Sequence, residues 1–217
     1  MILLVAFLSY VIPIVLFLLF CFKKAKIGLW VIFFYLLLSF AVDFFTGVSK
    51  FGHENARSIT SIFTICEFAM LASFFYLSFS NQTFKKITLY IIPVVLIFFV
   101  VNFVNSNKKD FDSTSASIES ITLIIFSIAY FFGEISKPQP YLIYSSPDFW
   151  IVLAILIYMS STLFLFIIAN NLSPQEKEKY WVINRVSNFI TNVIFCIAFV
   201  RNKYYQADQS AEKPSYY

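Results

Sequence analysis

The amino-acid sequence predicts an all-α, polytopic membrane protein with seven transmembrane helices. The chain of 217 residues is 59% hydrophobic and only 13% charged, whereas a soluble domain usually carries about 25% charged residues. Its 29 Phe residues are too many for a soluble core of this size, and four Gly and seven Pro are too few for a loop-rich β fold. These observations argue against a soluble enzyme, a disordered chain and a nucleic-acid-binding module. The net charge of +4 fits positively charged cytoplasmic loops better than a DNA-binding face.

Apolar stretches, each close to the roughly 20 residues that a membrane helix needs, follow one another along the chain. Short polar segments, which hold most of the charges, separate them. The seven stretches are Ile2–Phe22, Gly28–Gly47, Ile59–Phe79, Ile87–Val104, Ile118–Gly133, Phe149–Ala169 and Trp181–Val200. We therefore expect residues 1–200 to form a seven-helix transmembrane domain and residues 201–217 to form a polar cytoplasmic tail.

The first stretch predicts the orientation of the protein. It lacks a basic segment before it and a small-residue cleavage site after it, so it is expected to be a retained helix and not a signal peptide. Lys23, Lys24 and Lys26 follow it directly and favour a cytoplasmic first loop. Alternating the later loops places nine Lys and Arg residues inside and six outside. This bias predicts an N-terminus outside and a C-terminus inside.

Two helix starts carry capping signals. Ser146 followed by Pro147 is typical of an N-cap with Pro in the first helical position. Ser173 and Glu176 have the spacing of a capping box, in which the hydroxyl and the carboxylate each satisfy a backbone amide of the other residue. The last helix is therefore expected to begin there, before Trp181 reaches the membrane interface.

Ionisable residues inside the apolar stretches are the best sequence pointers to a site, because an intramembrane charge costs about 2.5–3.5 kcal/mol on insertion. Asp43, Glu67 and Arg185 are predicted to lie in one layer near the same membrane face. Arg185, Asn188 and Asn192 share one face of the last helix, and that face must avoid lipid. We expect Arg185 to pair with Glu67 or Asp43.

The candidate pocket for a ligand or an ion also includes a tyrosine of the sixth stretch. Its residues are Asp43, Glu67, Tyr158, Arg185, Asn188 and Asn192. A purely structural role remains an alternative, because buried polar side chains often only hold membrane helices together. Glu119 and Glu134, at the ends of the fifth stretch, are expected to be interfacial and solvated.

The sequence lacks the residues that several kinds of functional site require. Cys21, Cys66 and Cys196 form no CxxC motif and no cluster with the single His, so the sequence predicts neither a disulfide framework nor a metal site. The spans hold no Lys for a retinal Schiff base, and the chain has no GxSxG motif or phosphate-binding loop. We therefore expect no enzymatic activity, no catalytic residues and no cofactor.

A second functional class follows from a weak internal similarity. The segment Tyr10–Leu16 resembles Tyr90–Leu96, which would pair the first three stretches with the next three. Three is an odd number, so the second copy would be inverted, as in some transporters. Chance similarity between apolar segments is the alternative explanation.

Three short segments together resemble a known group of proteins. The segments are Thr64–Phe68, Asp148–Trp150 with Leu156–Tyr158, and Ile183–Asn184 with Cys196–Phe199. They are similar to small, largely uncharacterised seven-helix bacterial membrane proteins associated with sensor histidine kinases. The resemblance implies a sensing or signalling role, and it carries over no catalytic or binding residues.

The sequence therefore predicts a receptor-like, sensory component of the bacterial inner (cytoplasmic) membrane that signals through a partner protein. The expected partners are the lipid bilayer, an unidentified small-molecule ligand and a membrane-bound histidine kinase, with no nucleic acid. Short loops and a tail of about 17 residues leave little room for an output domain, so the signal is expected to pass by helix rearrangement. The alternative is a small-solute or ion-coupled transporter.

Overall fold

A computed structural model describes residues 2–49, 55–105, 112–137 and 143–211, and within these ranges the protein is helical and has no strand. Two short 3-10 helices, Ile143–Ser145 and Ala169–Asn171, precede and follow α7. The seven α-helices are α1 (Ile2–Phe20), α2 (Ile27–Val48), α4 (Ala56–Ser78), α5 (Gln82–Asn105), α6 (Ser113–Ile135), α7 (Pro147–Ile168) and α8 (Pro174–Ala211). Each predicted apolar stretch falls in one of these helices, which confirms the all-α prediction.

Length and composition support a membrane-embedded, multi-pass protein. Six helices, α2 and α4 to α8, are long and apolar enough to cross a membrane. The apolar segment found in α1, Ser9–Phe20, is shorter than these spans. A helix satisfies all of its own backbone hydrogen bonds, which is what a span in lipid requires.

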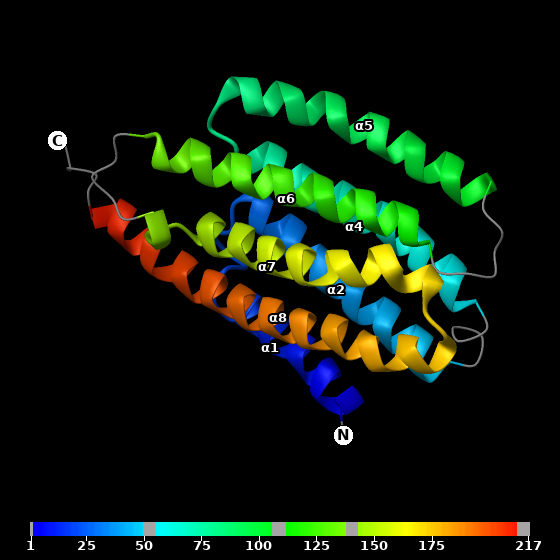
Figure 1. The fold of residues 1–217 in the computed structure, drawn as a ribbon. Coiled ribbons are helices and arrows are strands. Elements are labelled where there is room, and N and C mark those ends of the chain that lie inside the picture. The colour runs from blue at the N-terminus through cyan, green and yellow to red at the C-terminus, as the bar shows by residue number, and fades with distance from the viewer. Residues whose placement is uncertain (1, 50–54, 106–111, 138–142, 212–217) are drawn as a thin grey trace.

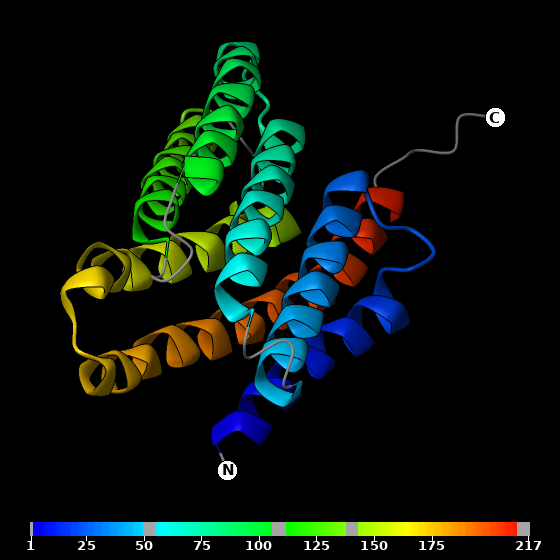
Figure 2. The same cartoon turned by 90° about the vertical axis from the view of Figure 1, so that its right-hand side faces the viewer.

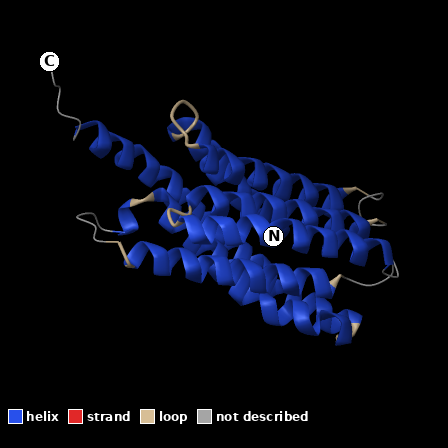
Figure 3. Ribbon diagram, turned by 90° about the horizontal axis from the view of Figure 1, so that it is seen from above, coloured by secondary structure: helices blue, strands red, loops and turns tan. Residues whose placement is uncertain are grey.

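Six of the helices form a ring. In sequence around the ring, α1 packs against α2, α2 against α4, α4 against α6, α6 against α7, α7 against α8, and α8 returns to α1 (Figures 1 and 2). α5 lies outside the ring and packs against α4 and α6, and its span is the least buried of the six. Seen from above, the helices run alongside one another for most of their length (Figure 3).

Both predicted capping signals are confirmed. The Ser146 side chain accepts a hydrogen bond from the Asp148 amide, with Pro147 opening α7. The Ser173 amide donates to Glu176 Oε2 at 2.9 Å, and the Glu176 amide donates to Ser173 Oγ at 3.4 Å. Hydrogen bonds from the Ser173 hydroxyl and amide hold the pKa of the Glu176 carboxyl below its ordinary value.

The last helix is longer than the sequence predicts. α8 continues through Val200 to Ala211, so the expected boundary at residue 200 falls inside a helix, and residues 212–217 lie outside the described ranges. Asn202 is fully buried and donates to Cys21 Sγ at 3.5 Å. Asn202, which the sequence assigns to the tail, therefore packs beside the end of α1 and lies within the apolar span Lys179–Tyr205 of the structure.

One end of the ring is filled by aromatic and aliphatic side chains, and we call it the closed half. Phe17 stacks on Phe33 with ring centroids 4.3 Å apart and meets Phe199 edge to face at 5.3 Å. On the other side of the ring, Phe75 meets Phe126 at 5.8 Å. The fully buried core of the closed half includes Phe17, Leu29, Ile32, Leu36, Phe68, Leu71, Phe74, Phe75, Leu123, Phe195 and Phe199.

Candidate ligand cavity

The other end of the ring, which we call the cavity half, encloses a cavity of about 410 Å³. It extends toward the end of the bundle where α2 ends, α4 begins and α7 is followed by α8, on the right in Figure 1. All six ring helices contribute to its wall, whereas α5 does not. The wall consists of Tyr10, Tyr35, Ser39, Val42, Asp43, Thr46, Ala56, Thr60, Phe63, Thr64, Glu67, Ala116, Glu119, Tyr158, Met159, Phe166, Trp181, Asn184 and Asn188.

Helical periodicity explains how each helix reaches the cavity. In α2, Tyr35, Ser39, Val42 and Thr46 recur three or four residues apart and therefore lie on one face. In α8, Trp181, Asn184 and Asn188 follow the same rule. The described residues that border the cavity thus belong to continuous helix faces.

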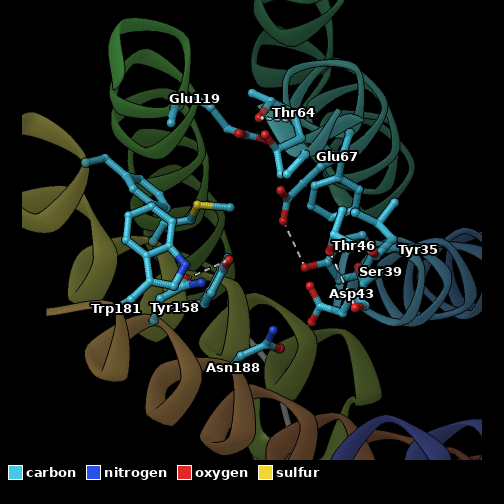
Figure 4. A pocket seen from close by; sticks show the side chains of 18 of the residues that line it. Tyr35, Ser39, Asp43, Thr46, Thr64, Glu67, Glu119, Tyr158, Trp181 and Asn188 are labelled. Atoms are coloured by element: carbon cyan, nitrogen blue, oxygen red, sulfur yellow. Dashed lines mark hydrogen bonds between the residues drawn. The ribbon is translucent and has the colours of Figure 1, made fainter. Parts of the chain in front are cut away.

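The inner wall holds a buried pair of polar groups. Tyr35 Oη donates a hydrogen bond to Glu67 Oε1 at 2.9 Å, and both residues are buried (Figure 4). Glu67 directly precedes Phe68, which is fully buried in the closed half. The Tyr35–Glu67 pair therefore marks the boundary between the polar cavity and the apolar packing beneath it.

A second group of hydrogen bonds ties three helices together, and we call it the Tyr10 network. Tyr10 Oη donates to Asp43 Oδ2 at 2.8 Å and accepts from Asn188 Nδ2. Asn192 Nδ2 donates to Ser9 Oγ at 3.0 Å and to Asn188 Oδ1 at 3.5 Å. The predicted polar residues Asp43, Asn188 and Asn192 thus meet in one network that joins α1, α2 and α8.

Tyr158 also lies where the sequence places it. Its hydroxyl donates to Asn184 Oδ1 at 3.3 Å and so links α7 to α8 at the cavity wall. In Figure 4, Tyr158 and Trp181 face Asp43 and Tyr35 from the opposite side of the cavity. Of the six predicted site residues, Asp43, Glu67, Tyr158 and Asn188 line the cavity, and Asn192 supports it from behind.

The predicted ion pair of Arg185 is wrong. Arg185 is exposed and does not line the cavity, and within the described residues the only ion pair joins Lys137 to Glu134. The reason is rotation, since residues 181, 184 and 188 face inward and residue 185 is turned to the flank of α8. Tyr10 and Tyr35 take the two acids instead, and Arg185 acts on Asp43 only electrostatically.

Glu119 is a cavity residue that the sequence interpretation missed. It is expected to be solvated, yet its side chain is only 3% exposed and lines the cavity. α6 begins at Ser113, five residues before the predicted Ile118, because Asp112 caps it by accepting from the Ser115 amide at 3.1 Å. Glu119 thus lies in the second turn, on the buried face that also carries Ser120. The periodicity of that face is the signal that would have identified it.

Two buried polar atoms at the cavity have no hydrogen-bond partner in the part of the chain that the structure describes. They are Oε1 of Glu119 and Oγ of Ser39, and the Ser39 side chain is 4% exposed. In Figure 4, Glu119 extends from α6 toward Thr64 on α4, while Ser39 lies near Asp43 on α2. A buried polar group without a partner costs free energy, so both atoms are available to a ligand.

The ionisable carboxyl groups of the cavity wall come from Asp43, Glu67 and Glu119. Glu67 is near enough to both Asp43 and Glu119 for their carboxylates to repel one another. No Lys, Arg or His is among the described residues that line the cavity. Among the described residues, no three His, Cys, Asp or Glu side chains are grouped closely enough to hold a metal ion. The arrangement can therefore bind a small molecule, and its acids are too dispersed to chelate one ion.

No protein-family model, curated protein or solved structure matches this chain. The resemblance to proteins associated with sensor histidine kinases therefore stays a prediction.

Proposed function

We propose that this protein is a receptor-like, sensory component of the inner membrane that binds a small molecule in the cavity and signals through a partner protein. The observation that carries the proposal is that all six ring helices contribute side chains to one cavity. A ligand there contacts every helix of the ring at once. Its binding energy therefore depends on how the helices are arranged, which is the requirement for a sensor.

The packing of the closed half favours a protein that binds a ligand over one that carries a solute across the membrane. Below the cavity, Phe68, Phe195 and Phe199 are fully buried and fill the centre of the ring. A carried solute would have to separate these rings on every cycle. A ligand that only binds and leaves by the same end needs no such opening, so the packing favours a receptor over a transporter.

The Tyr10 network supplies a way to convert binding into movement. Asp43 and Asn188 line the cavity and both bond to Tyr10, which belongs to α1. A ligand that bonds to Asp43 competes with the Tyr10 hydroxyl and loosens α1 from α2. Such a ligand shifts the population between two helix arrangements by its difference in affinity for them. A membrane-bound histidine kinase that contacts the ring would read this shift.

The proposed topology has seven crossings, with the N-terminus outside and the C-terminus inside. In that orientation the cavity half faces the outside, and the ring end that carries Lys23, Lys24, Lys85 and Lys137 faces the cytoplasm. Labelling of single cysteines with a membrane-impermeant reagent tests the topology. A cysteine introduced at Leu172 is expected to react in intact cells and one introduced at Ser80 is not, and the reverse pattern contradicts the orientation.

The signalling proposal is tested by filling the cavity. Thr64→Trp places an indole in the cavity, whereas the matched control Ser73→Trp adds it to the exposed face of the same helix. Co-reconstituted with a membrane-bound histidine kinase from the same genome, T64W is expected to change kinase autophosphorylation and S73W to leave it unchanged. Equal rates in wild type and both variants contradict the sensory proposal.

The transporter alternative rests on the membrane-buried acids and is tested separately. Proteoliposomes that hold wild-type protein are compared with Glu67→Gln for uptake of labelled solutes. Saturable uptake that E67Q abolishes establishes the transporter and overturns the sensory proposal. A kinase gene beside the gene for this protein favours sensing, whereas a metabolic operon favours transport.

A further inference from the structure

We infer that the ligand of the cavity is an organic cation, a protonated amine or quaternary ammonium compound with an apolar body. The inference rests on the proposed function, since it names the ligand class of the same cavity. It follows from the charge, the unpartnered groups and the aromatic surface of the wall, which are independent observations.

The charge of the wall is one-sided. Asp43, Glu67 and Glu119 come from three different helices, and no basic residue is among the described residues that line the cavity with them. Arg185, the counter-ion that the sequence predicts, is exposed and is not among the residues that line the cavity. Acids that lie close together in a low-dielectric space ionise only when a positive charge compensates them, and a cationic ligand supplies that charge. An anionic ligand does not.

Glu119 provides the most specific recognition. Its side chain is 97% buried, and its Oε1 has no hydrogen-bond partner among the described residues. Asp43 and Glu67, by contrast, each accept a tyrosine hydroxyl. Glu119 is therefore the acid that a ligand can engage without first breaking a bond within the protein.

The aromatic rings supply the second contact that an organic cation needs. Tyr10, Tyr35, Phe63, Tyr158, Phe166 and Trp181 all line the cavity. A cation over the face of such a ring is attracted by the electrons of the ring, most strongly when water is excluded. The rings also cover an apolar body, which a small inorganic ion lacks.

The size and spacing of the site disfavour an inorganic ion. The cavity of about 410 Å³ matches a small organic molecule. Calcium requires 6–8 oxygen atoms at about 2.3–2.6 Å, and the described acids are not grouped closely enough to hold a metal ion. Dispersed acids between aromatic rings instead fit a positive charge that is spread over an organic group.

The test compares three probes that differ in charge. Benzyltrimethylammonium is the cation, 2,2-dimethylpropylbenzene is its neutral analogue with carbon in place of nitrogen, and phenylacetate is the anion. Binding to the full chain in dodecyl maltoside is measured by equilibrium dialysis, with empty micelles subtracted. The cation is expected to bind the wild-type protein at least about 10-fold more tightly than either of the other probes.

Charge removal at a single acid sharpens the test. Glu119→Gln keeps the shape of the side chain and is expected to weaken cation binding by about 10-fold. Glu134→Gln is the matched control, because Glu134 lies on the same helix at the other end of the ring, beside Lys137, and is expected to have no effect. Asp43→Asn provides a second acid-to-amide change, with an expected loss in the same direction, if E119Q does not fold.

The outcomes separate the inference from the proposed function. If the neutral probe or phenylacetate binds as tightly as the cation and T64W abolishes that binding, the cavity is a ligand site and the cation inference is overturned. If the cation binds equally to wild type, E119Q and D43N, the inference is also overturned. If no probe binds at millimolar concentration, the inference fails, and only the kinase experiment then decides the proposed function.

Discussion

The two halves of the ring are built from the same helices and yet differ in what holds them together. In the closed half, α1, α2 and α8 meet through buried rings, since Phe17 packs against both Phe33 and Phe199. In the cavity half, the same helices meet through hydrogen bonds such as those of Tyr10. Along α4 the cavity half and the closed half are adjacent, since Glu67 lines the cavity and the next residue, Phe68, is fully buried in the closed half. A membrane helix that is apolar on average can thus carry a tightly packed segment next to a binding segment.

The largest difference between the halves should appear when an aromatic ring is removed. Phe75→Ala is expected to lower the free energy of unfolding by about 3–5 kcal/mol, because the ring is fully buried and the cavity it leaves cannot collapse. Unfolding of the purified protein by increasing sodium dodecyl sulfate in mixed micelles measures the change. The control Phe164→Ala, whose ring is 76% exposed, should change stability little. Equal losses in both variants would show that the closed half is not the packed core.

The next largest effect concerns the acids of the cavity half. Glu67→Leu is expected to destabilise the protein by about 1–3 kcal/mol, because it leaves the buried Tyr35 hydroxyl without its acceptor. Glu119→Leu should not destabilise it, because Glu119 Oε1 has no bond to lose. The same micelle unfolding assay compares the two variants. A larger loss for E119L than for E67L contradicts the assignment of Glu119 as the acid free for a ligand.

A smaller effect is expected from the Tyr10 network. Tyr10→Phe removes the hydroxyl that joins Asp43 to Asn188 and should cost about 0.6–1.7 kcal/mol, the range measured for hydrogen bonds between membrane helices. Tyr90→Phe is the matched control, since Tyr90 lies on α5 and is 71% exposed. A double-mutant cycle of Y10F with Asn188→Leu measures the coupling, and fully additive effects would mean that the two side chains do not interact.

The smallest effect lies outside the membrane, at the start of α8. Because the pKa of the Glu176 carboxyl is lowered, its capping contribution is complete above the ordinary value of 4.5 and is lost as the pH falls through the lower value of the folded protein. Hydrogen exchange at the Ser173 amide, which donates to the Glu176 carboxylate, and at the Glu176 amide, which donates to Ser173 Oγ, should therefore speed up, relative to its intrinsic rate, only in acid. Ser173→Ala is expected to speed exchange at the Glu176 amide by about fivefold at neutral pH and to reduce the acid dependence, because the backbone amide of residue 173 still bonds to the carboxylate. An unchanged acid dependence in S173A contradicts the capping role.

The helices could be predicted more fully than the site. The apolar stretches and the two capping signals at Ser146 and Ser173 gave the right elements, since both depend on residues close together in the chain. The start of α6 and the C-terminal end of α8 were not predicted, because neither is determined by the apolar stretch itself. Asp112 starts α6 early, and α8 continues past Asn202, which packs against Cys21.

The candidate site shows the same division. Polar residues are easily recognised within an apolar stretch of sequence, and this identified four residues that line the cavity: Asp43, Glu67, Tyr158 and Asn188. Arg185 was expected to pair with an acid because opposite charges are the simplest partners, whereas tyrosine hydroxyls, which do not stand out in an aromatic-rich sequence, bind the acids instead. Glu119 was assigned to solvent because it lies near the end of an apolar stretch.

The sequence by itself determined that this chain is helical and membrane-like, and it determined which face of the last helix is polar. These properties follow from the need of each apolar segment to satisfy its own backbone in lipid and from the 3.6-residue period. Only the tertiary structure decided which polar faces meet, that Arg185 stays outside and that Glu119 comes inside. The rotation of a helix about its axis is set by packing against neighbours that lie far away in the chain.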